Sequence, residues 1–171
     1  MAAGALAGLA GAGTAAAQTG ASEAAPDLSG KSILITGCSS GFGRLGAEHF
    51  ARLGAKVFAT MRNLPRPEAE TLSEIARRDG LDIEIIAIDV TSDDEVTAGV
   101  RQAEEMAGGA LDVLVNNAGI ALSGPVEVQD MAAMQKMFET NVFGCQRMAR
   151  AALPAMRAAG KGRPRNRDGP G

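Results

Sequence analysis

The sequence has 171 residues, of which 46% are hydrophobic and 22% charged, a composition typical of a globular protein with one core rather than of a disordered chain. Its formal net charge of −3 gives no overall positive charge that would attract nucleic acid or an anionic membrane. The absence of Tyr excludes a tyrosine acid or base among these residues, and the single histidine, His49, excludes a His-rich metal site.

Residues 1–30 differ from the rest of the chain in composition, because Ala and Gly dominate and no charged side chain occurs before Glu23. Two interpretations stay open. The segment is a flexible low-complexity leader, or it is the remnant of an export signal whose positively charged start is missing, since Lys31 is the first basic residue. A membrane span is not expected, because Ala and Gly carry too little apolar surface.

From Ser32 onward, short apolar runs alternate with helical stretches. The pattern predicts four strands, at 32–36, 56–60, 83–88 and 111–115. It predicts a helix after each strand: at 42–53, from Pro65 and Pro67 to about 78, from a cap at Thr91 or Ser92 to 107, and from 126 to about 158. The last helix is expected to change direction at Pro154.

Continuous apolar strands that alternate with helices predict an α/β fold with a doubly wound parallel sheet, covered on both faces. Right-handed crossovers then give the strand order 3-2-1-4. The fourth strand is expected to lie at an edge of an incomplete sheet. In the last helix, Met131, Met134 and Met137 recur at three-residue spacing and predict a packing face rather than a ligand site.

A glycine-rich segment lies where the first strand meets the first helix. Glycines that permit a tight turn and a close backbone approach, together with the free N–H groups of a helix N-terminus, are typical of a pyrophosphate site. A plain strand-to-helix turn is the alternative, but the strand before and the helix after favour the cofactor site. The candidate contacts are Gly37, Ser39, Ser40, Gly41, Phe42 and Gly43.

The residues at the end of the second strand indicate whether NAD(H) or NADP(H) is the preferred dinucleotide. A cofactor with a free 2′-hydroxyl usually meets an Asp or Glu there, and residues 57–63 contain neither. Arg62 can instead pair with a 2′-phosphate, although a solvated loop arginine is the alternative interpretation. The missing acid and Arg62 together favour NADP(H) over NAD(H).

Four motifs in this order resemble the short-chain dehydrogenase/reductase family over about residues 30–160. They are the TGxxxGxG pattern at 36–43, Asp89-Val90 after the third strand, Asn116-Asn117-Ala118-Gly119 after the fourth, and Asn141 in the last helix. The amino-acid sequence of the first motif and of residues 57–63 is similar to that of bacterial members related to the retinol and hydroxysteroid dehydrogenases.

The resemblance implies a Rossmann-like fold and an oxidoreductase that interconverts an alcohol and a carbonyl compound with NADP(H). It implies that Asp89 and Val90 contact the adenine, that Asn116, Ala118 and Gly119 line the cofactor site, and that Asn141 belongs to the catalytic tetrad. Purely structural roles stay open for Asp89 as a turn residue, for at least one asparagine of the pair 116–117, and for Asn141.

The family's remaining catalytic residues, a Ser and a Tyr-x-x-x-Lys motif, are not found here. Residues 160–171 predict an irregular basic Gly/Pro tail behind a dinucleotide-binding domain at 31–159, and they suggest a frameshift or truncation near Arg163. The alternative function is therefore a catalytically inactive dinucleotide-binding fragment. The resemblance also implies a cytoplasmic location, whereas a leader with export function would imply an exported protein. It further implies a homo-oligomer, which an incomplete partner surface would prevent.

Overall fold

The computed structural model describes residues 25–161. Its elements in chain order are β1 (Ser32–Ile35), α1 (Gly41–Arg52), β2 (Lys56–Met61), α2 (Pro67–Asp79), β3 (Ile83–Ala87), α3 (Asp93–Ala107), β4 (Val113–Val115), a 3-10 turn η1 (Val126–Val128), α4 (Met131–Phe138), a π-helical segment η2 (Glu139–Phe143) and α5 (Gly144–Ala158).

The four strands form one parallel sheet in the order β3-β2-β1-β4. This arrangement confirms the predicted α/β class and strand order. In the central strand β1, Leu34 lies beside Phe58 of β2 on one side and beside Leu114 of β4 on the other. All four residues of β1 are buried, as expected for a strand with neighbours on both sides and helices on both faces.

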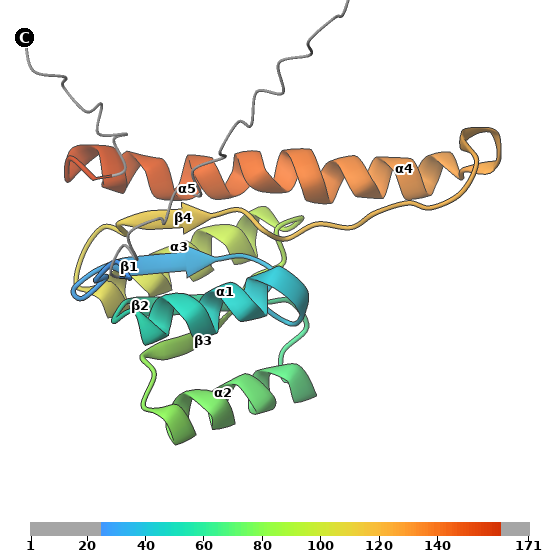
Figure 1. The fold of residues 1–171 in the computed structure, drawn as a ribbon. Coiled ribbons are helices and arrows are strands. Elements are labelled where there is room, and N and C mark those ends of the chain that lie inside the picture. Colours follow the sequence, from blue (N-terminus) through green and yellow to red (C-terminus); the bar gives the residue numbers. More distant parts are fainter. Residues whose placement is uncertain (1–24, 162–171) are drawn as a thin grey trace, which may run out of the picture.

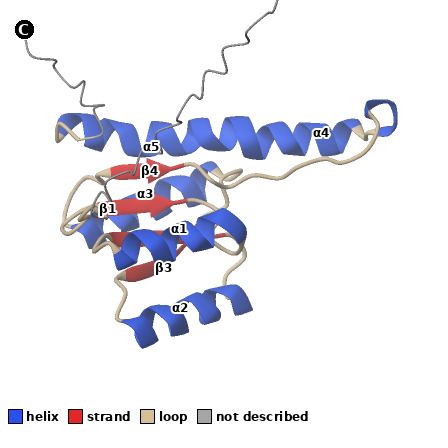
Figure 2. Ribbon diagram, in the orientation of Figure 1, coloured by secondary structure: helices blue, strands red, loops and turns tan. Residues whose placement is uncertain are grey.

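Helices cover both faces of the sheet, so the fold has three layers (Figures 1 and 2). Because successive side chains of a strand point to opposite faces, each strand contributes to two cores. Leu34, Phe58 and Ile86 pack with side chains from α3 and α5, whereas Ile33, Ile35 and Val57 pack with side chains from α1 and α2. The apolar runs of the strands thus position the two helical layers.

The last helix begins later than predicted, and its predicted end at about residue 158 is confirmed. Gln129 and Asp130 are extended, and the Asp130 carboxylate caps the helix by accepting from the N–H of Ala132, so the helix begins at Met131 rather than at Val126. The helix also continues through Pro154 to Ala158. Pro154 is exposed, so water can hydrate the carbonyl that loses its N–H partner.

The predicted packing face of methionines forms only in part among the residues described, where Met134 and Met137 are half-buried. No residue of α4 is buried, and Met131 is 68% exposed. The reason lies in the tertiary arrangement, because α4 extends past the end of the sheet, where no described layer covers it (Figure 1). Phe138, Val142 and Leu153 continue this exposed apolar surface along the same helix.

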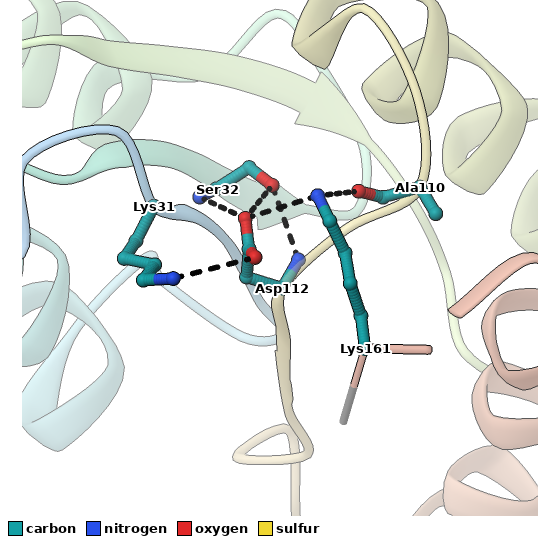
Figure 3. Close-up of polar contacts among 5 residues, drawn as sticks. All are labelled: Lys31, Ser32, Ala110, Asp112 and Lys161. Carbon is teal, nitrogen blue, oxygen red and sulfur yellow. Dashed lines mark hydrogen bonds and ion pairs between the residues drawn. The ribbon is translucent and has the colours of Figure 1, made fainter. Parts of the chain in front are cut away.

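The amino ends of β1 and β4 are joined by a polar cluster around Asp112 (Figure 3). The Asp112 carboxylate accepts from the N–H and the hydroxyl of Ser32, both at 3.0 Å, and the Ser32 Oγ accepts from the N–H of Asp112. Lys161 donates to Asp112 at 3.3 Å and to the carbonyl of Ala110 at 2.7 Å, which ties the end of α5 to the start of β4. Lys31 lies 3.8 Å from the other carboxylate oxygen.

As predicted, β4 is an edge strand of the sheet that the structure describes, and Val113 is 40% exposed. The proposed leader at 1–30 and tail at 160–171 fall largely on residues 1–24 and 162–171, which lie outside the described residues. Within residues 25–161, no helix has the length and apolar character needed to cross a membrane.

Candidate functional site

A cavity of about 350 Å³ lies at the carboxyl ends of the strands, where ligands collect in open α/β sheets. Its wall comes from the segments that follow all four strands. Among the predicted site residues, those that line it are Gly37, Ser39, Ser40, Phe42, Arg62, Asp89, Val90, Ala118 and Gly119. The tertiary structure thus brings together motifs from four separate parts of the chain.

The first turn of α1 faces this cavity without a side-chain cap. Ser40 is the N-cap residue, with an extended φ of −160°, but its side chain accepts no hydrogen bond from the helix. In contrast, Ser92 caps α3 by accepting from the N–H of Glu95, and Asp130 caps α4. The first turn of α1 also contains no acid, whereas that of α3 contains three. The N–H groups and partial positive charge of α1 are therefore available to an anionic ligand.

Close packing holds the glycine loop against the segment after β4. Asn117 Nδ2 donates to the carbonyls of Thr36 at 2.8 Å and Gly37 at 3.2 Å. A Cβ on Gly43 would lie 2.4 Å from both Asn117 Nδ2 and the Gly37 carbonyl oxygen, so only glycine fits here. Thr36 Oγ1 accepts from the N–H groups of Asn117 and Ala118, both at 2.9 Å. Asn117 therefore has the structural role expected for at least one asparagine of the pair.

Asp89 is both a turn residue and part of the cavity wall. Its Oδ1 accepts from the N–H of Thr91 at 2.9 Å and from the Thr91 hydroxyl at 2.7 Å. Burial by itself would raise the pKa of Asp89, but these hydrogen bonds and the positive charges of Arg62 and Lys136 hold that pKa below its usual value. The carboxylate is therefore ionised at neutral pH and lies within the electrostatic reach of Arg62.

Four predicted site residues do not line the cavity: Gly41, Gly43, Asn116 and Asn141. Gly43 acts through packing, as described above, and Gly41 has a φ of +58°, which favours glycine in the turn. Asn116 is exposed. Asn141 lies in the π-helical segment, where its Oδ1 accepts from the N–H of Ile120 at 2.9 Å and its Nδ2 donates to the Ile120 carbonyl at 2.8 Å.

Asn141 thus pairs with both backbone groups of Ile120 and holds the segment after β4 against the last helix. Replacing Asn141 by alanine is expected to increase hydrogen exchange at the Ile120 amide and to leave the β1 amides unchanged, because only the two side-chain bonds are lost. Mass spectrometry of hydrogen–deuterium exchange measures this. Equal exchange at Ile120 in both proteins would contradict the role.

The cavity is also lined by five residues that the sequence did not indicate as site residues: Met61, Arg66, Ile88, Ile120 and Thr140. A second arginine four positions after Arg62 was a usable signal for Arg66. The other four residues had no sequence signal that could have identified them, because apolar residues at strand ends and a threonine in a helix are common. Cys38 in the glycine loop is buried, and this burial raises the pKa of its thiol to about 12.

A larger groove of about 810 Å³ lies between α3 and α5, away from the strand ends. Arg147 in this groove pairs with Asp93 at 3.2 Å and with Glu139 at 2.8 Å. The charges of Arg147, Asp93 and Glu139 are therefore paired within the protein. The smaller cavity, which unites the sequence motifs, is therefore the better candidate site.

Comparison with known proteins shows the family of the chain. The sequence model of the short chain dehydrogenase family matches residues 31–163. Bovine retinol dehydrogenase 8 is 40% identical over 136 residues, which cover 77% of this chain and 42% of the bovine protein. Rat estradiol 17-beta-dehydrogenase 1 is 38% identical over 139 residues, covering 77% of this chain and 38% of the rat protein. The chain thus spans less than half the length of these curated relatives.

Solved structures give the same result. A gluconate 5-dehydrogenase from Burkholderia cenocepacia in complex with NADP and tartrate superposes with a TM-score of 0.71 and 32% identity, covering 79% of this chain and 52% of that one. An NADPH-bound carbonyl reductase from chicken fatty liver superposes with a TM-score of 0.69 and 28% identity, covering 75% of this chain and 52% of that one.

Proposed function

Because the chain belongs to the short-chain dehydrogenase family of oxidoreductases, we propose that the cavity binds a nicotinamide dinucleotide, NADP(H) in preference to NAD(H), for the interconversion of an alcohol and a carbonyl compound. The observation that carries this proposal is the uncapped, acid-free N-terminus of α1, which opens on a cavity that also contains Arg62. Bound there, the nicotinamide would supply or accept a hydride.

The residues present fit such a cofactor. The first turn of α1 and the hydroxyls of Ser39 and Ser40 offer donors for a pyrophosphate. Asp89 and Val90 lie on the part of the wall that follows β3, and we assign them to the adenine end. Ala118 and Gly119 follow β4, and we assign them to the nicotinamide end, with Asn141 as a positioning residue behind them.

The preference for NADP(H) rests on charge at the end of β2. No Asp or Glu occurs between 57 and 63, so a 2′-hydroxyl has no carboxylate partner there. Arg62 supplies a guanidinium instead, which suits a phosphate. The gluconate 5-dehydrogenase and the carbonyl reductase that superpose on this chain were both solved with the phosphorylated cofactor, which supports the same choice.

A second candidate function is dinucleotide binding without catalysis. It is favoured by the composition, because the 171 residues contain no Tyr to exchange the proton that accompanies hydride transfer. The two candidates share the cofactor site and differ only in turnover. Loss or gain of NADPH absorbance in the presence of alcohols and carbonyl compounds distinguishes them.

Fluorescence titration tests the cofactor proposal, and the absence of Trp keeps the protein background low. We expect NADPH to bind more tightly than NADH. Replacing Arg62 by glutamine is expected to weaken NADPH binding by about 10- to 100-fold, since a hydrogen bond to a charged group contributes roughly 1.5–3 kcal/mol. NADH binding should stay unchanged in that variant.

Arg101→Gln is the matched control, because Arg101 lies on the exposed surface of α3, where it pairs with Glu105 of the same helix. It should leave both affinities unchanged. Failure of the wild-type protein to bind either cofactor would refute the proposed site. An equal loss for NADPH and NADH in Arg62→Gln would refute the role in cofactor preference.

A further inference from the structure

Arg66 lines the same cavity as Arg62 but is held by an acid of its own helix. Its Nε and Nη2 each donate to one carboxylate oxygen of Glu68, both at 2.9 Å. This is the two-pronged contact in which a guanidinium binds a carboxylate or a phosphate most favourably. Its third nitrogen, Nη1, donates to the carbonyl of Arg62 at 3.3 Å. Arg66 is therefore connected to the position that distinguishes the two cofactors.

The pairing sets the charge of the cavity wall. Three charged residues line the cavity, namely Arg62, Arg66 and Asp89, whereas Glu68 lies in the first turn of α2 and is not part of the lining. As long as Glu68 is paired with Arg66, Arg62 is the cavity-lining cation without a carboxylate bonded to its guanidinium among the described residues, and its charge, like that of Lys136, acts on Asp89. The hydrogen bonds from Arg66 hold the pKa of Glu68 down at about 2, so the acid is ionised at any working pH.

The exposure of the pair makes an exchange of partners possible. The side chains of Arg66 and Glu68 are 26% and 40% exposed, so neither charge would be stranded in an apolar interior during the exchange. Exposed ion pairs are weak, because water screens them. A phosphate monoester carries more negative charge than a carboxylate and offers three acceptor oxygens. A ribose hydroxyl carries no charge and cannot compete.

We propose that Arg66 is a second cation for the 2′-phosphate of NADP(H), and that Glu68 competes with this phosphate for the Arg66 guanidinium. The inference rests on the proposed function, since it requires that the cofactor occupies the cavity. In the free protein Glu68 holds Arg66. On binding of NADP(H), Arg66 exchanges the carboxylate for the phosphate, whereas NAD(H) leaves the Arg66–Glu68 pair intact. Glu68 thus lowers the preference for the phosphorylated cofactor, and Arg66 raises it.

Three variants test this, with NADPH and NADH affinities measured by fluorescence titration. Arg66→Gln is expected to weaken NADPH binding about tenfold, because a charge-assisted bond is lost. Glu68→Gln is expected to strengthen NADPH binding about threefold, in keeping with the weakness of an exposed ion pair. The double variant should match Arg66→Gln, since Glu68 acts only through Arg66. NADH affinity should stay the same in all three.

A purely structural role of the pair at the start of α2 gives a different pattern. In that case both single variants would weaken NADPH and NADH equally, and this result, or weaker NADPH binding by Glu68→Gln, would overturn the inference. A folding defect cannot produce the expected gain in affinity. Competition by adenosine 2′,5′-bisphosphate and by AMP gives an independent readout, because only the former should respond to Glu68→Gln. If the wild-type protein binds neither cofactor, the proposed function fails as well.

Discussion

Replacing Gly43 by alanine is expected to destabilise the protein by about 1–3 kcal/mol, the usual cost of overpacking, and to weaken NADPH binding at least about tenfold. The added Cβ would lie 2.4 Å from the Gly37 carbonyl oxygen, which is backbone and cannot move alone. The glycine loop or α1 must shift, and both form the proposed pyrophosphate site. Thermal unfolding and fluorescence titration measure the two effects.

Gly46→Ala on the same helix is the matched control. The Cβ added there would meet only Phe50, at 3.7 Å, which is ordinary contact. Alanine is a better helix former than glycine, so the control should be more stable by about 0.5–1 kcal/mol. It should keep its cofactor affinity. If Gly43→Ala behaved like Gly46→Ala, the close approach of α1 to the glycine loop would be refuted.

Replacing Asp112 by alanine is expected to lower the free energy of unfolding by about 1–3 kcal/mol, the cost of leaving buried polar groups without partners. The Asp112 carboxylate accepts from the backbone N–H of Ser32, a residue that is only 7% exposed, and also from Lys161 (Figure 3). Urea unfolding at neutral pH measures the loss. Lys161→Ala should cost less than Asp112→Ala, because the Asp112–Ser32 bonds remain in it.

The Asp112 effect should also depend on pH. Burial by itself would raise the pKa of Asp112, but hydrogen bonds from Ser32 and Lys161 hold it below its usual value. Because the folded-state pKa is the lower one, the contribution is fully present above the unfolded pKa of about 3.9 and is lost as the pH falls through the folded value. The stability difference between wild type and Asp112→Ala should therefore be constant from about pH 7 to 5 and shrink below about pH 4. A difference that grew on acidification would contradict this assignment.

The substitutions Gly43→Ala and Asp112→Ala lie at opposite ends of the sheet. Gly43 lies at the carboxyl ends of the strands, beside the candidate cofactor site, whereas Asp112 joins the amino ends of β1 and β4 and anchors the end of α5 through Lys161. Cofactor affinity should respond to the first substitution much more than to the second. Comparing them separates a defect of the site from a general loss of stability.

Local patterns in the sequence determined the strands, most of the helices and the position of the glycine loop. Short apolar runs that alternate with helical stretches are typical of a covered parallel sheet, and the right-handed crossover rule then predicted the observed order. The motifs near Gly37, Arg62, Asp89 and Gly119 were found for a related reason, because each follows a strand and parallel strands end at the same edge.

Other features depended on contacts between distant segments. The bonds of Asn117 to the glycine loop, and the ion pair of Arg147 with Asp93, join residues more than 50 positions apart and arise only when the chain folds. The spacing of Met131, Met134 and Met137 predicted a packing face, yet α4 lies beyond the described sheet, because periodicity shows which residues share a face and not what covers it. The sequence by itself thus determined the family, the sheet and the position of the glycine loop. Only the tertiary structure decided which side chains share the cavity and which charge is paired with which, since those depend on three-dimensional distance rather than on separation along the chain.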